Sequence, residues 1–559
     1  MNSLLLVIIS LGAFIVAYRF YARFLGRRLF KLDRSRKTPA HEFEDGIDYV
    51  PTRRSILFGH HFASIAGTGP IVGPAIAVIW GWLPAVVWIV VGSIFMGAVH
   101  DFGALVISVR HKGKSICEIS KWLVNPQVRT MLFLVIFFAL MIVIAIFCMV
   151  IAIIFDQYPQ AMFPVWLEVP LAVMLGYRFY RSGSSRGGVH ILFWSVVALV
   201  IMYVSIYIGI FVPIRIPAIW GLSPLTLWVL ILLTYSYVAS ILPVWSLLQP
   251  RDYINAHELT VALLLLLAGV AVVHPTITAP RTNLSVTGAP QFIPFLFITI
   301  ACGAISGFHS LVGSGTSAKQ LDSEANARFI GYGGMMAEAV LAIVVIVCCT
   351  AGLGSLSAWS ERYGSWQAAS GLVAKVGAFV DGGSTFLVAL GIPRRLALGI
   401  LGVFVASFAG TTLDTATRIQ RYVVAELATD HGVKPLANRY GAGLFAVVTA
   451  GALAFAQGGG KGALTLWPLF GTTNQLLAAI AFLLITVYLM RKRLPSLYTM
   501  IPMVFMLGIT LWALVLNLAD YIEARYWHLA VIGGSVFVLA VWIVVQTVRV
   551  LKSKAVRTA

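Results

Sequence analysis

Apolar stretches of about 20 residues recur along almost the whole chain, and each is long enough to cross the hydrocarbon core of a bilayer as a helix. The strands of an outer-membrane barrel are only ~10 residues long and alternate in polarity, so these stretches exclude a barrel. They predict an all-α polytopic membrane protein with about fifteen transmembrane helices. The predicted spans are residues 3–25, 56–80, 84–109, 130–155, 160–178, 188–212, 224–248, 258–274, 290–317, 329–352, 394–417, 440–457, 463–490, 498–518 and 528–548.

The composition agrees with an integral membrane protein. Hydrophobic residues make up 59% of the 559 residues and charged residues only 11%, whereas soluble proteins carry roughly 25% charged residues. The formal net charge of +19 fits basic loops that face anionic lipid, and no nucleic-acid partner is predicted. The five cysteines show no metal-ligand spacing, so neither disulfides nor a metal cofactor are expected.

The distribution of basic residues predicts an orientation. With the N-terminus outside and the C-terminus in the cytoplasm, most of the 40 Lys and Arg residues fall in cytoplasmic loops, as the positive-inside tendency requires. No soluble domain remains between the spans. The 353–393 segment lies outside in this topology, and its "GLVAKVGAFV" predicts a short interfacial helix.

Glycine and proline interrupt the second span, in "HHFASIAGTGPIVGP" at residues 60–74. Proline lacks a backbone N–H and glycine permits nonhelical dihedrals, so this stretch predicts a broken helix. Unpaired backbone groups are tolerated at membrane depth only beside a cavity or inside protein, and broken helices form substrate sites in secondary transporters. The alternative is a plain kink with close helix packing. The candidate site residues here are His61, Gly67, Thr68, Gly69 and Pro70.

Ionisable and hydroxyl side chains inside two other spans are also functional candidates, because burial in lipid makes them costly. "GAVHDF" places two of them in the third span, where adjacent residues point about 100° apart and need not pair with each other. "CGAISGFHSLVGSGTSAKQ" presents a stripe of small polar residues, which predicts a polar pathway or, alternatively, close helix packing. The candidates are His100, Asp101, Ser306, His309, Ser310, Ser314, Thr316 and Ser317.

Two later spans carry further polar residues. In "ASFAGTTLDTATRIQRY" (residues 406–422) hydroxyl and carboxylate oxygens share one helix face and suit Na⁺ or proton-linked hydrogen bonds. Asp414 could instead be held by Arg418, four residues later on the same face, as a structural lock. "LWPLFGTTNQLLAA" (466–479) could line a cavity or hold two helices together. The candidates are Thr411, Thr412, Asp414, Thr415, Asn474 and Gln475.

Together these stretches, with "QPRDY" at 249–253, resemble the carbon starvation protein A (CstA) family of bacterial membrane proteins. The resemblance covers most of the chain and implies membership of the amino acid–polyamine–organocation superfamily. It implies a leucine-transporter-like core of two inverted five-helix repeats with broken helices. It also implies a bacterial cytoplasmic membrane location, uptake of pyruvate or peptides, and coupling to an ion, with protons expected and Na⁺ as an alternative.

This resemblance suggests a division of the chain. Residues 1–55 would form an N-terminal helix and a basic cytoplasmic loop, and 56–212 the first repeat. The second repeat could begin at 224 or at 290. We favour 224, so that 224–490 holds the second repeat with additional helices and 498–559 the C-terminal helices and basic tail.

The sequence thus predicts a secondary transporter, and no enzyme, that imports a small carboxylate by proton-coupled alternating access. Pyruvate is the preferred substrate, short peptides are the nearest alternative, and a nutrient-binding sensor is a third. No organic cofactor is expected. Backbone groups around Gly67–Pro70 are predicted to hold the substrate. His61, His309 and Ser310 are predicted to contact substrate or protons, and Asp101 and Asp414 to couple transport to the ion.

Overall fold

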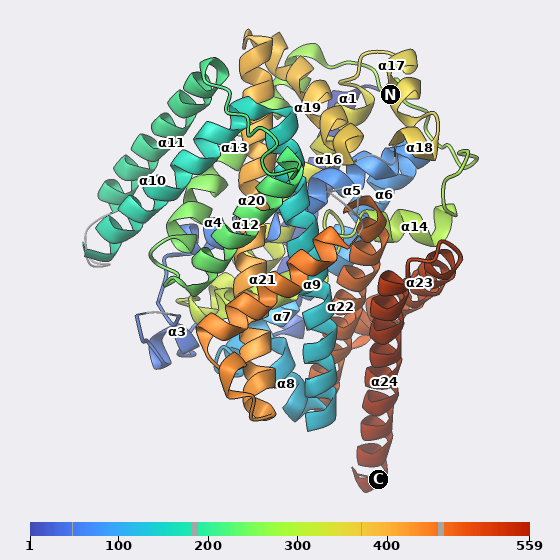
Figure 1. Cartoon of the computed structure of the whole chain (residues 1–559). Coiled ribbons are helices and arrows are strands. Elements are labelled where there is room, and N and C mark those ends of the chain that lie inside the picture. The colour runs from blue at the N-terminus through green and yellow to red at the C-terminus, as the bar shows by residue number, and fades with distance from the viewer. Residues whose placement is uncertain (47, 182–187, 370–371, 457–462, 559) are drawn as a thin grey trace.

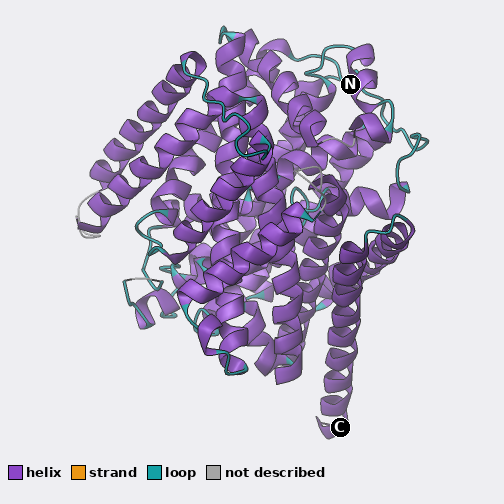
Figure 2. Cartoon of the chain, viewed as in Figure 1, coloured by secondary structure: helices purple, strands orange, loops and turns teal. Residues whose placement is uncertain are grey.

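The computed structural model describes residues 1–559 except 47, 182–187, 370–371, 457–462 and 559. Within the described residues, regular structure consists of helices joined by loops, with isolated bridges but no strand (Figure 2). Eleven of these helices are long and apolar enough to cross a membrane, or twelve when one bent pair is counted. This confirms an all-α, multi-pass membrane protein.

Each of the fifteen predicted spans contains a helix, but the helices of three spans are not among these twelve. They are α10 (Met162–Arg181), α21 (Arg439–Phe455), and the pair α14 (Phe292–Thr299) and α15 (Gly307–Gly315). The two chain ends lie at opposite ends of the helix bundle (Figure 1). The twelve spans are Ser3–Leu29, Arg54–Trp80 (the bent pair), Trp82–Arg110, Pro126–Gln157, Phe193–Phe211, Pro224–Ile241, Leu248–Val273, Glu324–Thr350, Arg394–Asp430, Leu466–Arg491, Leu497–Glu523 and Trp527–Lys552.

Three long helices form the centre of the bundle. In their most apolar windows, 83% of α9 (Pro126–Gln157), 89% of α20 (Arg394–Asp430) and 94% of the described part of α22 (Ala463–Arg491) is buried. The first span and α24 (Trp527–Thr558) are only 33% and 28% buried. Because all of these helices are apolar, the low burial places the first and last spans among those that face lipid, together with Phe193–Phe211, which is also 33% buried.

Two helices are broken near the middle of the bundle. The helix α4 (Arg54–Ile65) is followed after three residues by α5 (Gly69–Ala77), and the two are bent by 46°. Similarly, α14 and α15 are separated by the nonhelical residues 300–306. The two broken helices pack together, α5 against α14 and α4 against α15. The break predicted around Gly67–Pro70 is therefore present, at residues 66–68, and it lies beside a second break.

The 353–393 segment differs from its prediction. Its helix α19 (Leu372–Ala389) packs against α13 (Leu248–Val273), α16 (Gly333–Thr350) and α20. Phe379 and Phe386 on this helix are fully buried. The prediction rests on residues 371–380, which are long enough only for a short helix. The apolar residues that continue to Ala389 make the helix long enough to enter the bundle.

Candidate functional site

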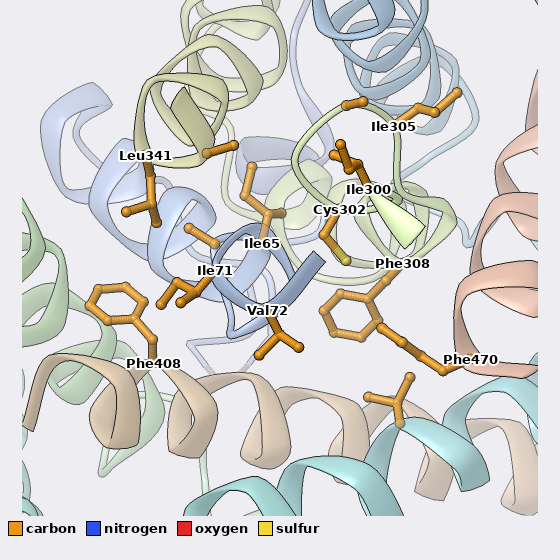
Figure 3. Packing of buried hydrophobic residues seen from close by; sticks show 14 of the residues in the cluster. Ile65, Ile71, Val72, Ile300, Cys302, Ile305, Phe308, Leu341, Phe408 and Phe470 are labelled. Carbon is orange, nitrogen blue, oxygen red and sulfur yellow. The ribbon is translucent and has the colours of Figure 1, made fainter. Parts of the chain in front are cut away.

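The two breaks enclose a small cavity. Figure 3 shows Cys302, Phe308 and Phe470 gathered beside the start of α5. The cavity has a volume of about 10 Å³, roughly the space of one water molecule. The broken backbone is thus closed off from solvent in this conformation. The cavity is lined by Ile65, Gly67, Gly69, Val143, Phe147, Cys302, Phe308, Thr412 and Phe470.

Glycines allow this close approach. A Cβ atom on Gly67 would lie 2.3 Å from Thr412 Oγ1, and one on Gly69 would lie 2.3 Å from Cys302 Sγ. Pro70 falls in the first turn of α5, where its missing N–H costs nothing. The hydroxyls of Thr68 and Thr412 are buried and have no hydrogen-bond partner among the described residues. The predicted stretch therefore supplies part of the cavity wall through Gly67 and Gly69, and the unpaired hydroxyl of Thr412 on α20 lines the cavity as well.

Two side chains from α22 form hydrogen bonds to residues at the second break. Asn474 Oδ1 accepts a hydrogen bond from the backbone N–H of Phe308 at 2.9 Å, and its amide donates to Ser306 Oγ at 3.0 Å. Gln475 Nε2 donates to the carbonyl of Phe297 at 2.6 Å. The Phe308 N–H and the Phe297 carbonyl are backbone groups that an unbroken helix would pair internally. The two predicted amides thus hold the ends of α14 and α15 in place.

The polar residues of the third span and α15 form one buried cluster. His309 Nδ1 lies 2.8 Å from Asp101 Oδ2, and His100 Nδ1 lies 2.8 Å from Asp101 Oδ1. On its other side His309 Nε2 lies 3.2 Å from Glu338 Oε2 of α16. All four side chains are fully buried. His100 and Asp101 therefore do pair, although adjacent positions on a helix need not.

The hydroxyls on α15 do not form the predicted polar pathway, because they donate to carbonyls of their own helix. Ser310 Oγ donates to the Gly307 carbonyl at 2.7 Å, and Thr316 Oγ1 to the Val312 carbonyl at 2.9 Å, both within the helix. Ser314 Oγ donates to the Ser310 carbonyl at 2.6 Å and accepts from the Ile116 N–H at 3.1 Å.

Beyond α15, Ser317 lies within 2.8 Å of His61 Nδ1. Of the predicted stripe of small polar residues, Ser306 and Ser317 therefore form hydrogen bonds to side chains of other helices. Ser310 bonds within its own helix turn.

The polar face of α20 belongs to a separate ionic network. Asp414 Oδ2 accepts from Arg251 Nη1 at 2.5 Å and from Tyr235 at 2.8 Å. The alternative of a lock between Asp414 and Arg418 is wrong, because Arg418 donates instead to the Leu242 carbonyl. The arginine that holds Asp414 comes from α13, a helix that local spacing does not identify.

The same network also reaches α10 and makes a second contact with α13. Arg251 Nε donates to Glu168 Oε1 at 3.1 Å, and Ser407 donates to Glu168 Oε2 at 3.1 Å. Thr411 accepts from Asn255 Nδ2 at 2.6 Å. Thr415 is also buried. These contacts join α20 to α10 and α13, so this face holds the scaffold together.

Several buried ionisable residues were not predicted. Glu338, Glu168 and Glu258 are each fully or almost fully buried, and Asp252 lies 2.6 Å from His60. Each glutamate stands within an apolar span, which is the signal that could have identified it. Among the described residues, no group of three or more His, Cys, Asp or Glu side chains is arranged to hold a metal ion.

Comparison with known proteins identifies the family of this chain. Residues 2–356 and 362–513 match the family model for carbon starvation protein CstA. The chain is 34% identical to a peptide transporter CstA of Campylobacter jejuni, over 94% of this chain and 81% of that protein. It is 34% identical to the pyruvate/proton symporter BtsT of Escherichia coli, over 92% of this chain and 82% of that protein.

Among solved structures, a manganese transporter of Eremococcus coleocola aligns with a TM-score of 0.49 at 11% identity, covering 91% of this chain and 99% of that one. The family is set by sequence, since the model match and the identities extend over nearly the whole chain. The curated relatives are transporters. The chain is a multi-pass membrane transporter that belongs to the carbon starvation protein CstA family.

Proposed function

We propose that this transporter imports pyruvate together with a proton by alternating access. The observation that carries the proposal is the buried chain Asp101–His309–Glu338, which lies directly beside the closed cavity. His309 follows Phe308, which lines the cavity, and its imidazole lies against the backbone carbonyl of Ile65 at the end of α4. A change in the charge or position of His309 therefore affects both breaks.

The cluster is built to hold an exchangeable proton. A doubly protonated His309 can face both carboxylates with an N–H group, whereas a neutral His309 has only one N–H to offer. A carboxylate left without a donor in this fully buried site must then carry a proton itself, because an uncompensated buried charge is costly. Loss of a proton therefore favours a conformation in which water reaches the cluster. This links proton release to opening of the bundle.

The cavity suits a small carboxylate. The start of α5 faces the cavity through Gly69, and that helix has no side-chain cap on its N–H groups. Pro70 has no N–H, and those of Ile71 and Val72 donate to the Thr68 carbonyl, so the proposed anion site rests on the Gly69 N–H and the positive end of the helix dipole. The hydroxyl of Thr412, which lines the cavity and has no hydrogen-bond partner among the described residues, adds a donor, and the apolar wall accommodates a methyl group. Opening of the two breaks would enlarge this site enough for pyruvate.

We further propose that the second repeat begins near residue 290. Each unit would then start with a broken helix, α4–α5 at Arg54 and α14–α15 at Phe292, and these two helices pack against each other. Each unit would also carry short helices after its second span, α8 (Ile116–Leu123) and α17 (Leu356–Tyr363). A second repeat starting at residue 224 would leave α14–α15 without a counterpart.

The protein is proposed to lie in a bacterial cytoplasmic membrane with its N-terminus outside and its C-terminus in the cytoplasm. Its named relatives are bacterial. The excess of Lys and Arg in alternate loops supports the orientation. In that frame α4 starts at the cytoplasmic end, and the two breaks lie between the two surfaces.

Uptake of labelled pyruvate into proteoliposomes tests this function. With an inward proton gradient, accumulation is expected, and a protonophore should abolish it. A parallel series at equal pH on both sides carries an inward Na⁺ gradient instead. Accumulation that follows Na⁺ and ignores the proton gradient would overturn proton coupling. Absence of pyruvate uptake under either gradient would overturn the substrate assignment.

Peptide uptake is the second candidate, because several relatives at the same level of identity are peptide transporters. A peptide has groups at both ends and needs a longer site than pyruvate. Dipeptides and tripeptides should therefore be tested as competitors of pyruvate uptake and as labelled substrates themselves. Competition by peptides at lower concentration than unlabelled pyruvate would favour the peptide function.

A further inference from the structure

A wide cleft lies outside the transport site, beside the end of the first span. This span runs from α1 (Ser3–Val16) through η1 (Ala17–Tyr21) and α2 (Ala22–Phe24) to η2 (Leu25–Leu29). The cleft has a volume of about 770 Å³ and is closed on its other side by the residues around η8 (Arg328–Tyr332). Five guanidinium groups line it, those of Arg19, Arg23, Arg27, Arg34 and Arg328.

Wide helical turns bring three of these arginines to one side. Arg19 lies in the π-helical η1 and Arg27 in the π-helical η2, with Arg23 between them. In an α-helix of 3.6 residues per turn, residues four apart drift steadily around the axis. The wider π-turn, closed by i→i+5 bonds, counteracts this drift. The first span therefore presents a row of positive charge to the cleft.

The carboxylates nearest to this cleft are engaged elsewhere. Glu324 is held by Arg36 at 2.9 Å and by Arg110 at 2.5 Å. Asp33 accepts hydrogen bonds from Ser35. No ion pair to an acidic side chain is formed by the five lining arginines within the described part of the chain. Because like charges repel when they share a cleft, such an arrangement favours an anion among them.

The surroundings of the cleft point to a lipid as the source of that anion. Ile15 lines the cleft and is 64% exposed, while Val16 and Phe20 beside it are 56% and 66% exposed. These side chains lie on the span that faces lipid, immediately before the row of arginines. An acyl chain can therefore lie along the helix while its headgroup reaches the charges.

We propose that this cleft binds the phosphate headgroup of an anionic phospholipid. Arginine binds phosphate with paired N–H groups, and basic pockets between membrane helices are suited to lipid headgroups with more than one phosphate. The large volume and five guanidiniums favour such a headgroup over a single phosphate. Arg328, whose guanidinium lies 5.4 Å from the centre of the Tyr18 ring, is positioned from the opposite wall.

Native mass spectrometry of the purified full chain tests this proposal. The protein is titrated with cardiolipin, phosphatidylglycerol and phosphatidylcholine. Cardiolipin is expected to bind most tightly and phosphatidylcholine most weakly. The test variant replaces Arg19, Arg23 and Arg27 with Gln. At roughly 1 kcal/mol per basic residue near an anionic lipid, it should lose at least about tenfold in cardiolipin affinity.

The matched control removes three exposed charges away from the cleft, in the variant Lys121→Gln, Lys434→Gln and Lys492→Gln. It should bind cardiolipin as the parent does, and equal loss in both variants would overturn a local site. A third arm adds inorganic phosphate or pyrophosphate without lipid. If these anions bind the parent as tightly as cardiolipin does, the lipid assignment is overturned. Size-exclusion chromatography of all variants confirms that each one is folded.

Discussion

His309 Nδ1 lies 2.8 Å from Asp101 Oδ2, although the two residues are 208 positions apart in the chain. Asp101 stands on α7 (Ala98–Arg110) and His309 on α15. The contact therefore ties the second half of a broken helix to the span that follows the other broken helix. Any change in the charge of this pair acts directly on the relative position of the two helices.

Replacement of Glu338 by Gln should uncouple transport from the proton gradient. The amide keeps the shape of the side chain but can no longer take up or release a proton beside His309. Accumulation of pyruvate under an inward proton gradient should fall to the level seen without a gradient, while exchange of labelled for unlabelled pyruvate persists. The exposed Glu361→Gln is the matched control. Full gradient-driven accumulation by Glu338→Gln would contradict the role of this carboxylate.

Substitution of Gly67 should block transport without preventing insertion. A Cβ atom at this position would lie 2.3 Å from Thr412 Oγ1 and 2.9 Å from Phe147 Cε1. Such overpacking costs about 1–3 kcal/mol, and it fills the cavity where substrate is proposed to bind. Gly67→Ala should lower uptake and Gly67→Val should abolish it, at normal levels in the membrane fraction.

The control for these variants is Gly313→Ala on α15. A Cβ atom there has no neighbour closer than 4.0 Å, so uptake should stay near that of the parent. Normal uptake by Gly67→Val would show that the break is a structural kink and not part of the substrate site.

The helices were largely predictable because bilayer thickness fixes the length of each apolar stretch. The break at residues 66–68 was predictable for a different reason. Glycine and proline recur in this stretch, and both disrupt a helix inside a span. The break at 300–306 was harder to find, because "ACGAISG" contains no proline and reads as small residues at a helix contact. The structure shows that α14 ends at Thr299 and α15 begins at Gly307, and that α14 packs against α5 and α23 (Leu497–Glu523).

The partners of the polar residues could not be predicted from spacing. A lock between Asp414 and Arg418 was the alternative to a coupling role because the two are one helical turn apart, but the fold brings Arg251 to Asp414 from 163 residues earlier. His309 and Asp101 were both identified as costly groups at membrane depth, yet nothing in the sequence indicated that they meet. Glu338 carried the same signal as Asp101, because it too is an ionisable side chain within an apolar span.

Loss of Arg251 should destabilise the whole protein. Arg251→Ala would leave Glu168 and Asp414 buried without a counter-ion, and breaking a buried pair in this way costs about 3–5 kcal/mol. The midpoint of thermal unfolding in detergent should fall markedly. Arg418→Ala, which removes a contact to a backbone carbonyl, should lower it less.

A compensated variant separates charge from packing in this network. Arg251→Met combined with Glu168→Gln and Asp414→Asn removes all three charges at similar volume, and it should regain much of the lost thermal stability. If the triple variant is no more stable than Arg251→Ala, the network acts through shape and hydrogen bonds, and the ionic account is wrong.

Removal of the Asn474 amide should disturb the second break specifically. Asn474→Ala leaves the N–H of Phe308 without its acceptor, and an unsatisfied buried donor costs about 1–3 kcal/mol. Because Phe308 lines the cavity and precedes His309, pyruvate uptake should fall by more than the stability change alone explains. Thr473→Ala is the neighbouring control, since that hydroxyl donates only to carbonyls of its own helix. Uptake and thermal stability that change equally in the two variants would show that the amide does not position the break.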